Sequence, residues 1–136
     1  MTAHPYLRAY MAGIVVPTMF LLVIFAFFWV MRFVYNVPIP IEHVLVFPMA
    51  LVPNLWGVWN ILYMRMGSGR RLPIGLHGAM LVFVLSPIGY LLVRAQQYLI
   101  VPSPLILAIF GGIMVIYYLV WKYAVAFLND LLGISS

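Results

Sequence analysis

The sequence predicts an all-α membrane protein in which four transmembrane helices form an up-and-down bundle. Of its residues, 67% are hydrophobic and only 7% are charged, whereas a soluble domain carries roughly 25% charged residues. Four apolar segments also approach or exceed the roughly 20 residues that a helix needs to cross a bilayer. Strands of an outer-membrane barrel would alternate polar and apolar residues, and no such alternation occurs. We therefore expect one transmembrane domain covering residues 1–136.

The first predicted helix covers residues 9–31. It resembles a signal peptide only superficially, because it is longer than a typical apolar signal region, Arg32 follows it directly and no small-residue cleavage site appears. We expect it to be retained as a spanning helix. Its second half, residues 19–31, contains almost no small or polar side chain. This part is expected to face lipid or a partner subunit.

The second predicted helix covers residues 43–64. It follows a short connection that contains Pro38 and Pro40, and proline cannot continue a helix because it lacks a backbone N–H. Inside this helix lies the stretch VPNLWGVWN, residues 52–60. Its proline, asparagines, glycine and tryptophans interrupt an apolar run, so it is the first place to look for a buried polar site.

The third and fourth predicted helices cover residues 72–93 and 104–121. A turn at residues 65–71, rich in glycine and arginine, precedes the third helix. The connection at residues 96–104 has an apolar middle, and we expect it to lie along the membrane interface.

Cationic residues at the ends of the helices predict the orientation. With four crossings, both termini and the second connection share one side, which holds five cations, while two cations and an acidic residue lie opposite. The positive-inside rule then places both termini in the cytoplasm, and we expect a bacterial inner membrane. Because these flanking cations account for the net charge of +5, no nucleic-acid partner is expected. The first group is Arg8, Arg65, Arg70, Arg71 and Lys122, and the second is Arg32, Arg94 and Glu42.

Small residues at helical spacing predict where helices pack closely, because small side chains let membrane helices approach one another. In the third helix they fall on one arc, and in the fourth a further pair is separated by three residues. The predicted packing seam is Gly75, Gly78, Ser86, Gly89, Ala108 and Gly112.

A polar cluster is predicted between the second and third helices. Asn54 and Asn60 share a broad face of the second helix with Gly57 between them, whereas Trp59 points to another side. If the two helices form an antiparallel hairpin, His77 lies within a turn of both asparagines. An imidazole and an amide at that depth are a candidate ligand site. They could equally hydrogen-bond to each other and only hold the helices together.

A second candidate group lies at the opposite end of the bundle. The same hairpin geometry places Glu42 level with Arg94, with Arg32 entering from the first helix and His43 alongside. Such a group could admit protons or bind an anion. Close to the lipid headgroups it could also be an ordinary exposed ion pair, which contributes little.

The residues that most catalytic sites need are scarce. The chain has no cysteine and two acidic residues, and its three histidines lie in different segments. This excludes thiolate chemistry, paired carboxylates and a metal site built from one chain. The sequence therefore predicts no metal, no cofactor and no catalytic residue.

Three functions are compatible with this pattern. Strong packing signals and sparse chemistry favour a small accessory or structural subunit of a membrane assembly, or a homo-oligomer. An oligomeric channel or carrier for a small neutral or anionic solute is the alternative, because helix-bending residues surround the middle of the bundle. A membrane enzyme acting on a lipid or quinone would depend on His77 with Asn54 and Asn60. The expected partners are the lipid bilayer and either copies of this chain or a larger membrane complex.

Overall fold

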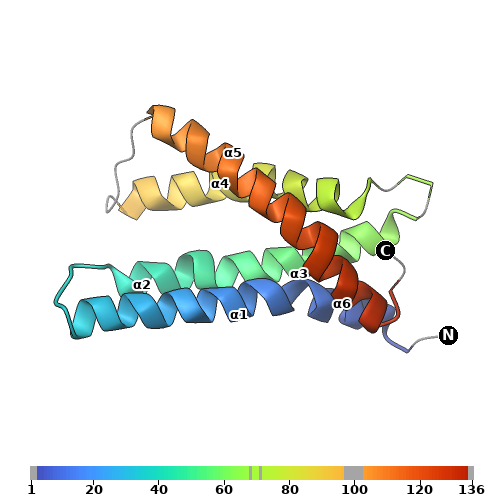
Figure 1. Cartoon of the computed structure of the whole chain (residues 1–136), viewed down its shortest axis with the longest axis horizontal. Coiled ribbons are helices and arrows are strands. Elements are labelled where there is room, and N and C mark those ends of the chain that lie inside the picture. Colours follow the sequence, from blue (N-terminus) through green and yellow to red (C-terminus); the bar gives the residue numbers. More distant parts are fainter. Residues whose placement is uncertain (1–2, 68, 71, 97–102, 135–136) are drawn as a thin grey trace.

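The computed structural model describes residues 3–67, 69–70, 72–96 and 103–134, and these residues form four helices without any strand (Figure 1). Three of the four are long and apolar enough to cross a membrane, namely Pro5–Phe33, Ile74–Leu92 and Pro104–Leu131. The predicted all-helical architecture is therefore confirmed, and the structure is compatible with an integral membrane protein. The elements are α1 (Pro5–Phe33), α2 (Ile41–Val44), η1 (Leu45–Ala50), α3 (Leu51–Arg65), α4 (Ile74–Gln96), α5 (Ser103–Val120), η2 (Trp121–Val125) and α6 (Ala126–Leu131).

The second helix is continuous but irregular, since α2, η1 and α3 follow one another without a break. The middle part, η1, is a π-helix that contains Pro48. Proline cannot donate the backbone hydrogen bond of a regular α-helix, and wider π turns often occur where the regular pattern fails.

The fourth helix is longer than the predicted residues 104–121, because it continues through η2 and α6 to Leu131. The sequence contains no glycine or proline between Gly112 and Gly133. Gly133 ends the helix in the left-handed conformation, with φ 75°. The Gly133 N–H donates to the Asp130 carbonyl, and the Ile134 N–H donates to the Asn129 carbonyl at 2.7 Å. This is a Schellman motif, which satisfies the last carbonyls of a helix.

The helices form two closely packed pairs (Figure 1). α1 lies along α3, and α4 packs against α5. The last helix then crosses obliquely, so that α6 reaches α1 at the end where both termini lie (Figure 1). The two pairs are therefore tied together mainly at the end that carries the termini.

The pair formed by α1 and α3 is closest at two glycines. A Cβ atom added to Gly13 would lie 2.6 Å from the Trp56 carbonyl oxygen and 2.8 Å from the Gly57 Cα. Ala9 and Ala12 are fully buried on the same part of α1. Small residues thus allow the two backbones to touch. This contact was not predicted, although Ala9, Ala12 and Gly13 have the helical spacing that indicates one.

Glycines also set the contact between α4 and the last helix. A Cβ atom on Gly78 would lie 2.0 Å from the Trp121 ring, and one on Gly75 would lie 2.8 Å from the Tyr118 ring. Trp121 is completely buried as a result. Two large aromatic side chains therefore occupy the space that two glycines leave.

Candidate functional site

Three polar side chains are buried among the residues that the structure describes: Asn60, His77 and Asn129. Two of these were predicted as site residues. Because an unpaired amide or imidazole is costly in hydrocarbon, their hydrogen-bond partners show what they do.

Asn60 joins three helices. Its Nδ2 donates to the Ala9 carbonyl of α1 at 2.7 Å and to Oδ1 of Asn129 in α6 at 2.7 Å. Nδ2 of Asn129 donates back to Oδ1 of Asn60 at 3.1 Å. Each amide therefore serves the other as donor and acceptor. Both side chains are fully buried, so this amide pair holds α1, α3 and α6 together.

Asn129 was missed by the sequence analysis because it lies beyond the predicted end of the fourth helix. The available signal was the continuous helical pattern up to Gly133, which carries Asn129 one turn before the cap. Its backbone carbonyl accepts from the Ile134 N–H, and Ile134 packs against Ala9 and Ala12. The end of the last helix is thereby fixed to the start of the first.

His77 is held by Trp59 in a reciprocal contact between α4 and α3. Nε2 of His77 lies 2.9 Å from the Trp59 carbonyl oxygen, and the Trp59 indole N–H donates to the His77 carbonyl at 2.7 Å. A carbonyl can only accept, so Nε2 carries the proton. The two rings are stacked, with centroids 5.0 Å apart. Trp59, which was predicted to point elsewhere, is thus the partner of His77.

The predicted polar cluster is divided between three places. Asn54 is exposed, where its Nδ2 donates to the Ala50 carbonyl at 2.6 Å and its Oδ1 accepts from the Tyr10 hydroxyl. Asn60 bonds to Ala9 and Asn129, as described above. The structure therefore does not bring Asn54, Asn60 and His77 together around one ligand.

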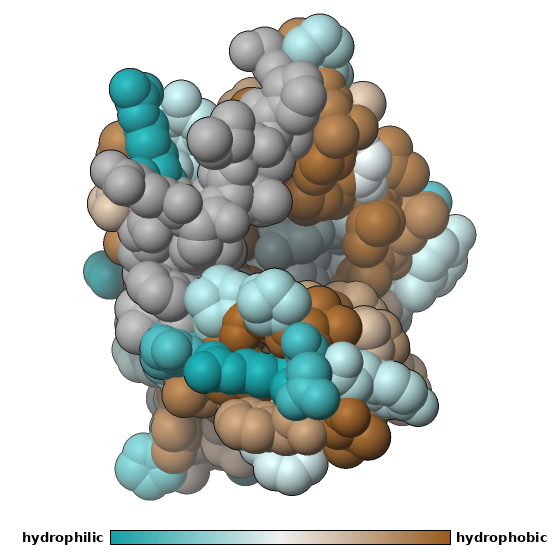
Figure 2. Space-filling model, turned by 90° about the vertical axis from the view of Figure 1, so that its left-hand side faces the viewer, coloured by the Kyte–Doolittle hydropathy of each residue, from teal (hydrophilic) through white to brown (hydrophobic). Residues whose placement is uncertain are grey.

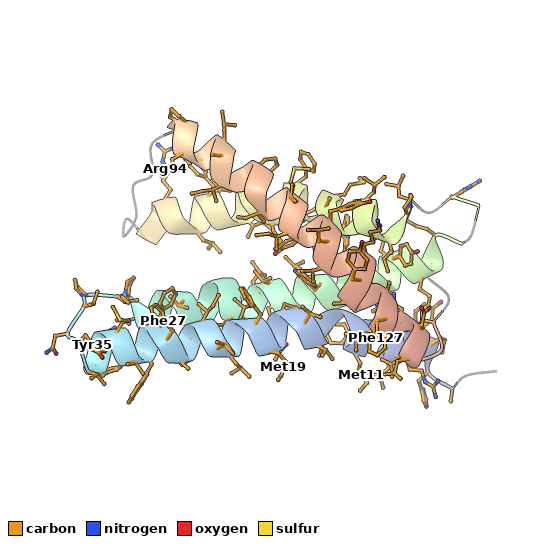
Figure 3. The ribbon with its side chains drawn as sticks, viewed as in Figure 1. Met11, Met19, Phe27, Tyr35, Arg94 and Phe127 are labelled. Carbon is orange, nitrogen blue, oxygen red and sulfur yellow. The ribbon has the colours of Figure 1, made fainter. Side chains whose placement is uncertain are left out.

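At the opposite end, Arg32 pairs with Glu42, with NH1 and Oε2 2.7 Å apart. NH1 of Arg32 also donates to the Ile39 carbonyl at 3.1 Å. Arg94 lies on the other helix pair (Figure 3), where it donates to the Tyr90 hydroxyl at 3.4 Å. The side chain of His43 lies outside the described part of the structure. Since the Glu42 and Arg32 side chains are 68% and 35% exposed, solvent screening weakens this pair.

Some residues of the predicted packing seam are buried between helices, and others are exposed on the surface. Gly75, Gly78 and Gly89 are buried on α4, and Ser86 is half-buried. On α5, in contrast, Ala108, Gly111 and Gly112 are exposed, and a Cβ atom on either glycine would meet nothing within 4 Å.

No protein-family model, curated protein or solved structure matches the chain. Among the residues that the structure describes, no three histidine, aspartate or glutamate side chains lie together as metal ligands would.

Proposed function

We propose that this protein is a small structural or accessory subunit of a membrane assembly, formed either with copies of itself or with a larger complex. One observation carries the proposal. The buried polar side chains that could perform chemistry, Asn60 and His77, are bonded to other groups of the same chain. Groups used in this way stabilise helix contacts.

The exposed face of α5 supports an assembly role. Ala108, Gly111 and Gly112 are exposed on the surface of the folded chain. No contact with another described residue therefore requires the two glycines to be small. Glycine costs about 1 kcal/mol relative to alanine inside a helix, and close approach of a neighbouring helix would offset this cost. This face is therefore our candidate contact with another subunit.

In this proposal the four helices cross the bilayer as an up-and-down bundle, with both termini on the cytoplasmic side of a bacterial inner membrane. The course of the chain supports this arrangement, because the two termini and the turn between α3 and α4 lie at the same end (Figure 1). Arg8, Arg65 and Arg70 belong to that end, as the positive-inside rule requires.

The double substitution Gly111→Leu and Gly112→Leu tests the assembly role. Because two leucines would hold a neighbouring helix away, we expect the variant to lose its oligomer or partner, measured by native mass spectrometry in mild detergent. Its unfolding temperature, followed by tryptophan fluorescence, should stay close to that of the original chain.

Phe127→Ala is the control, because Phe127 is also highly exposed but lies about four turns beyond the glycine pair. It should leave the assembly intact. A wild-type chain that is monomeric and recovers no partner would contradict the proposal. A second outcome would also contradict it. If the Asn60→Leu variant kept its assembly but lost a solute flux that the wild-type protein shows in vesicles, the alternative function as a channel or carrier would be favoured.

A further inference from the structure

The second helix has an inner side, towards the other helix pair, and an outer side. On the inner side, Val52 and Trp56 of α3 line an apolar cavity of about 440 Å³ between the two pairs. Figure 2, which faces the left-hand end of Figure 1, shows the molecule hollowed between its upper and lower parts. Asn54 stands two residues from each of them, which is about 160° around a helix. It therefore lies on the outer side of α3, away from the cavity.

A stripe of exposed side chains runs along this outer side. Its members recur at intervals of four residues, and all of them are exposed: Ala50, Asn54, Val58 and Leu62. Residues at this spacing lie one above another on a helix. Asn54 is the polar member, and it lies 11 residues before the end of α3 at Arg65, which is about 16 Å along the helix. In the proposed arrangement, this depth is near the middle of a hydrocarbon layer about 30 Å thick.

The chain uses only half of the hydrogen-bonding capacity of the Asn54 amide. A side-chain amide has two N–H donors and two lone pairs on its oxygen. One N–H donates to the Ala50 carbonyl at 2.6 Å, and the oxygen accepts from the Tyr10 hydroxyl. Among the described residues, these are its two partners. One donor and one acceptor therefore remain on an exposed side chain, and in hydrocarbon such groups are costly unless a partner meets them.

A donor beside an acceptor makes the amide self-complementary. Asn60 and Asn129 show the arrangement within the chain, because each amide donates to the other, at 2.7 and 3.1 Å. A second copy of the chain brings an identical amide. Two copies inserted in the same direction can be related by a two-fold axis along the membrane normal, which gives an interface made of the same surface on both. Such an axis places the same residue of both copies at the same depth.

We propose that two copies of this chain pair through the outer side of α3, with each Asn54 amide donating to and accepting from the partner's Asn54. Ala50 and Val58, one turn away on either side, form the packed part of the contact, and the small Ala50 side chain lets the helices approach closely. The inference rests on the proposed function. It names a second copy as one partner and adds a contact on α3 to the one proposed on α5, which stays free for a further subunit.

Cysteine cross-linking in the membranes of expressing cells tests the pairing, and the chain has no cysteine of its own that would interfere. Ala50→Cys and Val58→Cys each place one thiol beside the two-fold axis. Because a disulfide needs Cβ atoms about 4 Å apart, oxidation with copper phenanthroline should give a covalent dimer in both variants. Met19→Cys is the control, since Met19 is 64% exposed but points about 180° away from Tyr10 on α1. It should give at least fivefold less dimer.

A second substitution separates the amide from the packing around it. Asn54→Leu keeps the size of the side chain but removes its donors and acceptor, and in the Val58→Cys background it should lower the dimer yield at least fivefold. Tyr10→Phe in the same background removes the bond within the chain and leaves the amide in place, so the yield should stay within twofold. The unfolding temperature of each variant in mild detergent shows whether it is folded. Asn54→Ala is used if Asn54→Leu fails to fold.

Two results would overturn the pairing. One is a dimer yield in the two α3 cysteine variants that does not exceed the yield in Met19→Cys. The other is an equal yield with and without the Asn54→Leu substitution.

The glycine variant of α5 separates a failure here from a failure of the proposed function. The double substitution Gly111→Leu and Gly112→Leu should keep the cross-link through α3 and lose only the subunits that attach through α5. If the cross-link is absent but native mass spectrometry detects an oligomer or partner that this variant loses, the proposed function stands and the pairing through α3 is wrong.

Discussion

At the scale of single residues, the buried polar side chains illustrate how a membrane protein uses hydrogen bonds. Asn60 and Asn129 pair through both donor and acceptor, and His77 and Trp59 each bond to the other's backbone. In both cases an alternative partner is scarce in hydrocarbon, so the pairs specify which helices meet. Measured interhelical hydrogen bonds in membranes nevertheless contribute only about 0.6 kcal/mol on average.

A double-mutant cycle measures the coupling energy between the Asn60 and Asn129 side chains. Asn60→Leu or Asn129→Leu alone leaves one amide buried without its partner, so each should lower the free energy of unfolding by about 1–3 kcal/mol. The double variant should lose less than the sum, with a coupling energy of about 0.6–1.7 kcal/mol. Reversible unfolding in mixed micelles, followed by tryptophan fluorescence, gives these values. Strict additivity of the two losses would show that the amides do not act as a pair.

At the scale of elements, glycine determines how closely neighbouring helices pack. Gly13 and Gly57 bring α1 against α3, and Gly75 and Gly78 receive the aromatic side chains of the last helix. Gly111 and Gly112, in contrast, face outward. Glycine at helical spacing therefore indicates a contact, but the partner can lie inside or outside the chain.

Gly78→Ala tests the inner contact. Its Cβ atom would overlap the Trp121 ring, which is buried and cannot move without disturbing its neighbours. Overpacking of this kind should lower the free energy of unfolding by about 1–3 kcal/mol.

Gly112→Ala is the matched control on the outer face. Here the added methyl group meets nothing, and the higher helix propensity of alanine should raise the stability of the monomer by up to about 1 kcal/mol. Both variants are compared by their unfolding temperatures in the same detergent. If Gly78→Ala proved as stable as the wild type, the close approach of α4 and η2 would be wrong.

At the scale of the whole molecule, two helix pairs are joined mainly at one end and leave a cavity between them near their middle. The tie consists of the Trp121 contact, the Asn60 and Asn129 pair, and Ile134 packed on α1. The contacts that hold the pairs together therefore lie mainly towards the termini. In a bilayer, the hydrocarbon chains of lipids can fill the space that the protein's own side chains leave open. This architecture is therefore compatible with a membrane.

The proposed orientation can be measured with reporter fusions. Alkaline phosphatase, which is active only outside the cytoplasm, should be inactive when fused after Ser136 or inserted at Gly69, and active when inserted at Val37. A fluorescent protein that folds in the cytoplasm should give the opposite pattern. Activity of phosphatase at Gly69 would reverse the orientation, and activity at both Val37 and Gly69 would show that the segment from residue 41 to residue 65 does not cross.

The helical fold could be predicted from the sequence because hydrocarbon leaves a chain little choice. An apolar segment that is long enough to cross must bond its own backbone, so length and composition suffice for three helices. The positions of Gly75, Gly78, Asn60 and His77 within their helices could be read in the same way. The partners of these residues could not, because helical periodicity defines a face but not the neighbour that covers it.

The amino-acid sequence alone was enough to predict an all-helical chain compatible with a membrane, with few groups capable of chemistry. The three-dimensional arrangement of the helices was needed to show that Asn60 pairs with Asn129, that His77 pairs with Trp59, and that Ala108 and Gly112 are exposed. It alone shows the cavity beside Trp56. The physical reason is that backbone hydrogen bonding is local, whereas side-chain pairing and cavities depend on how distant helices cross.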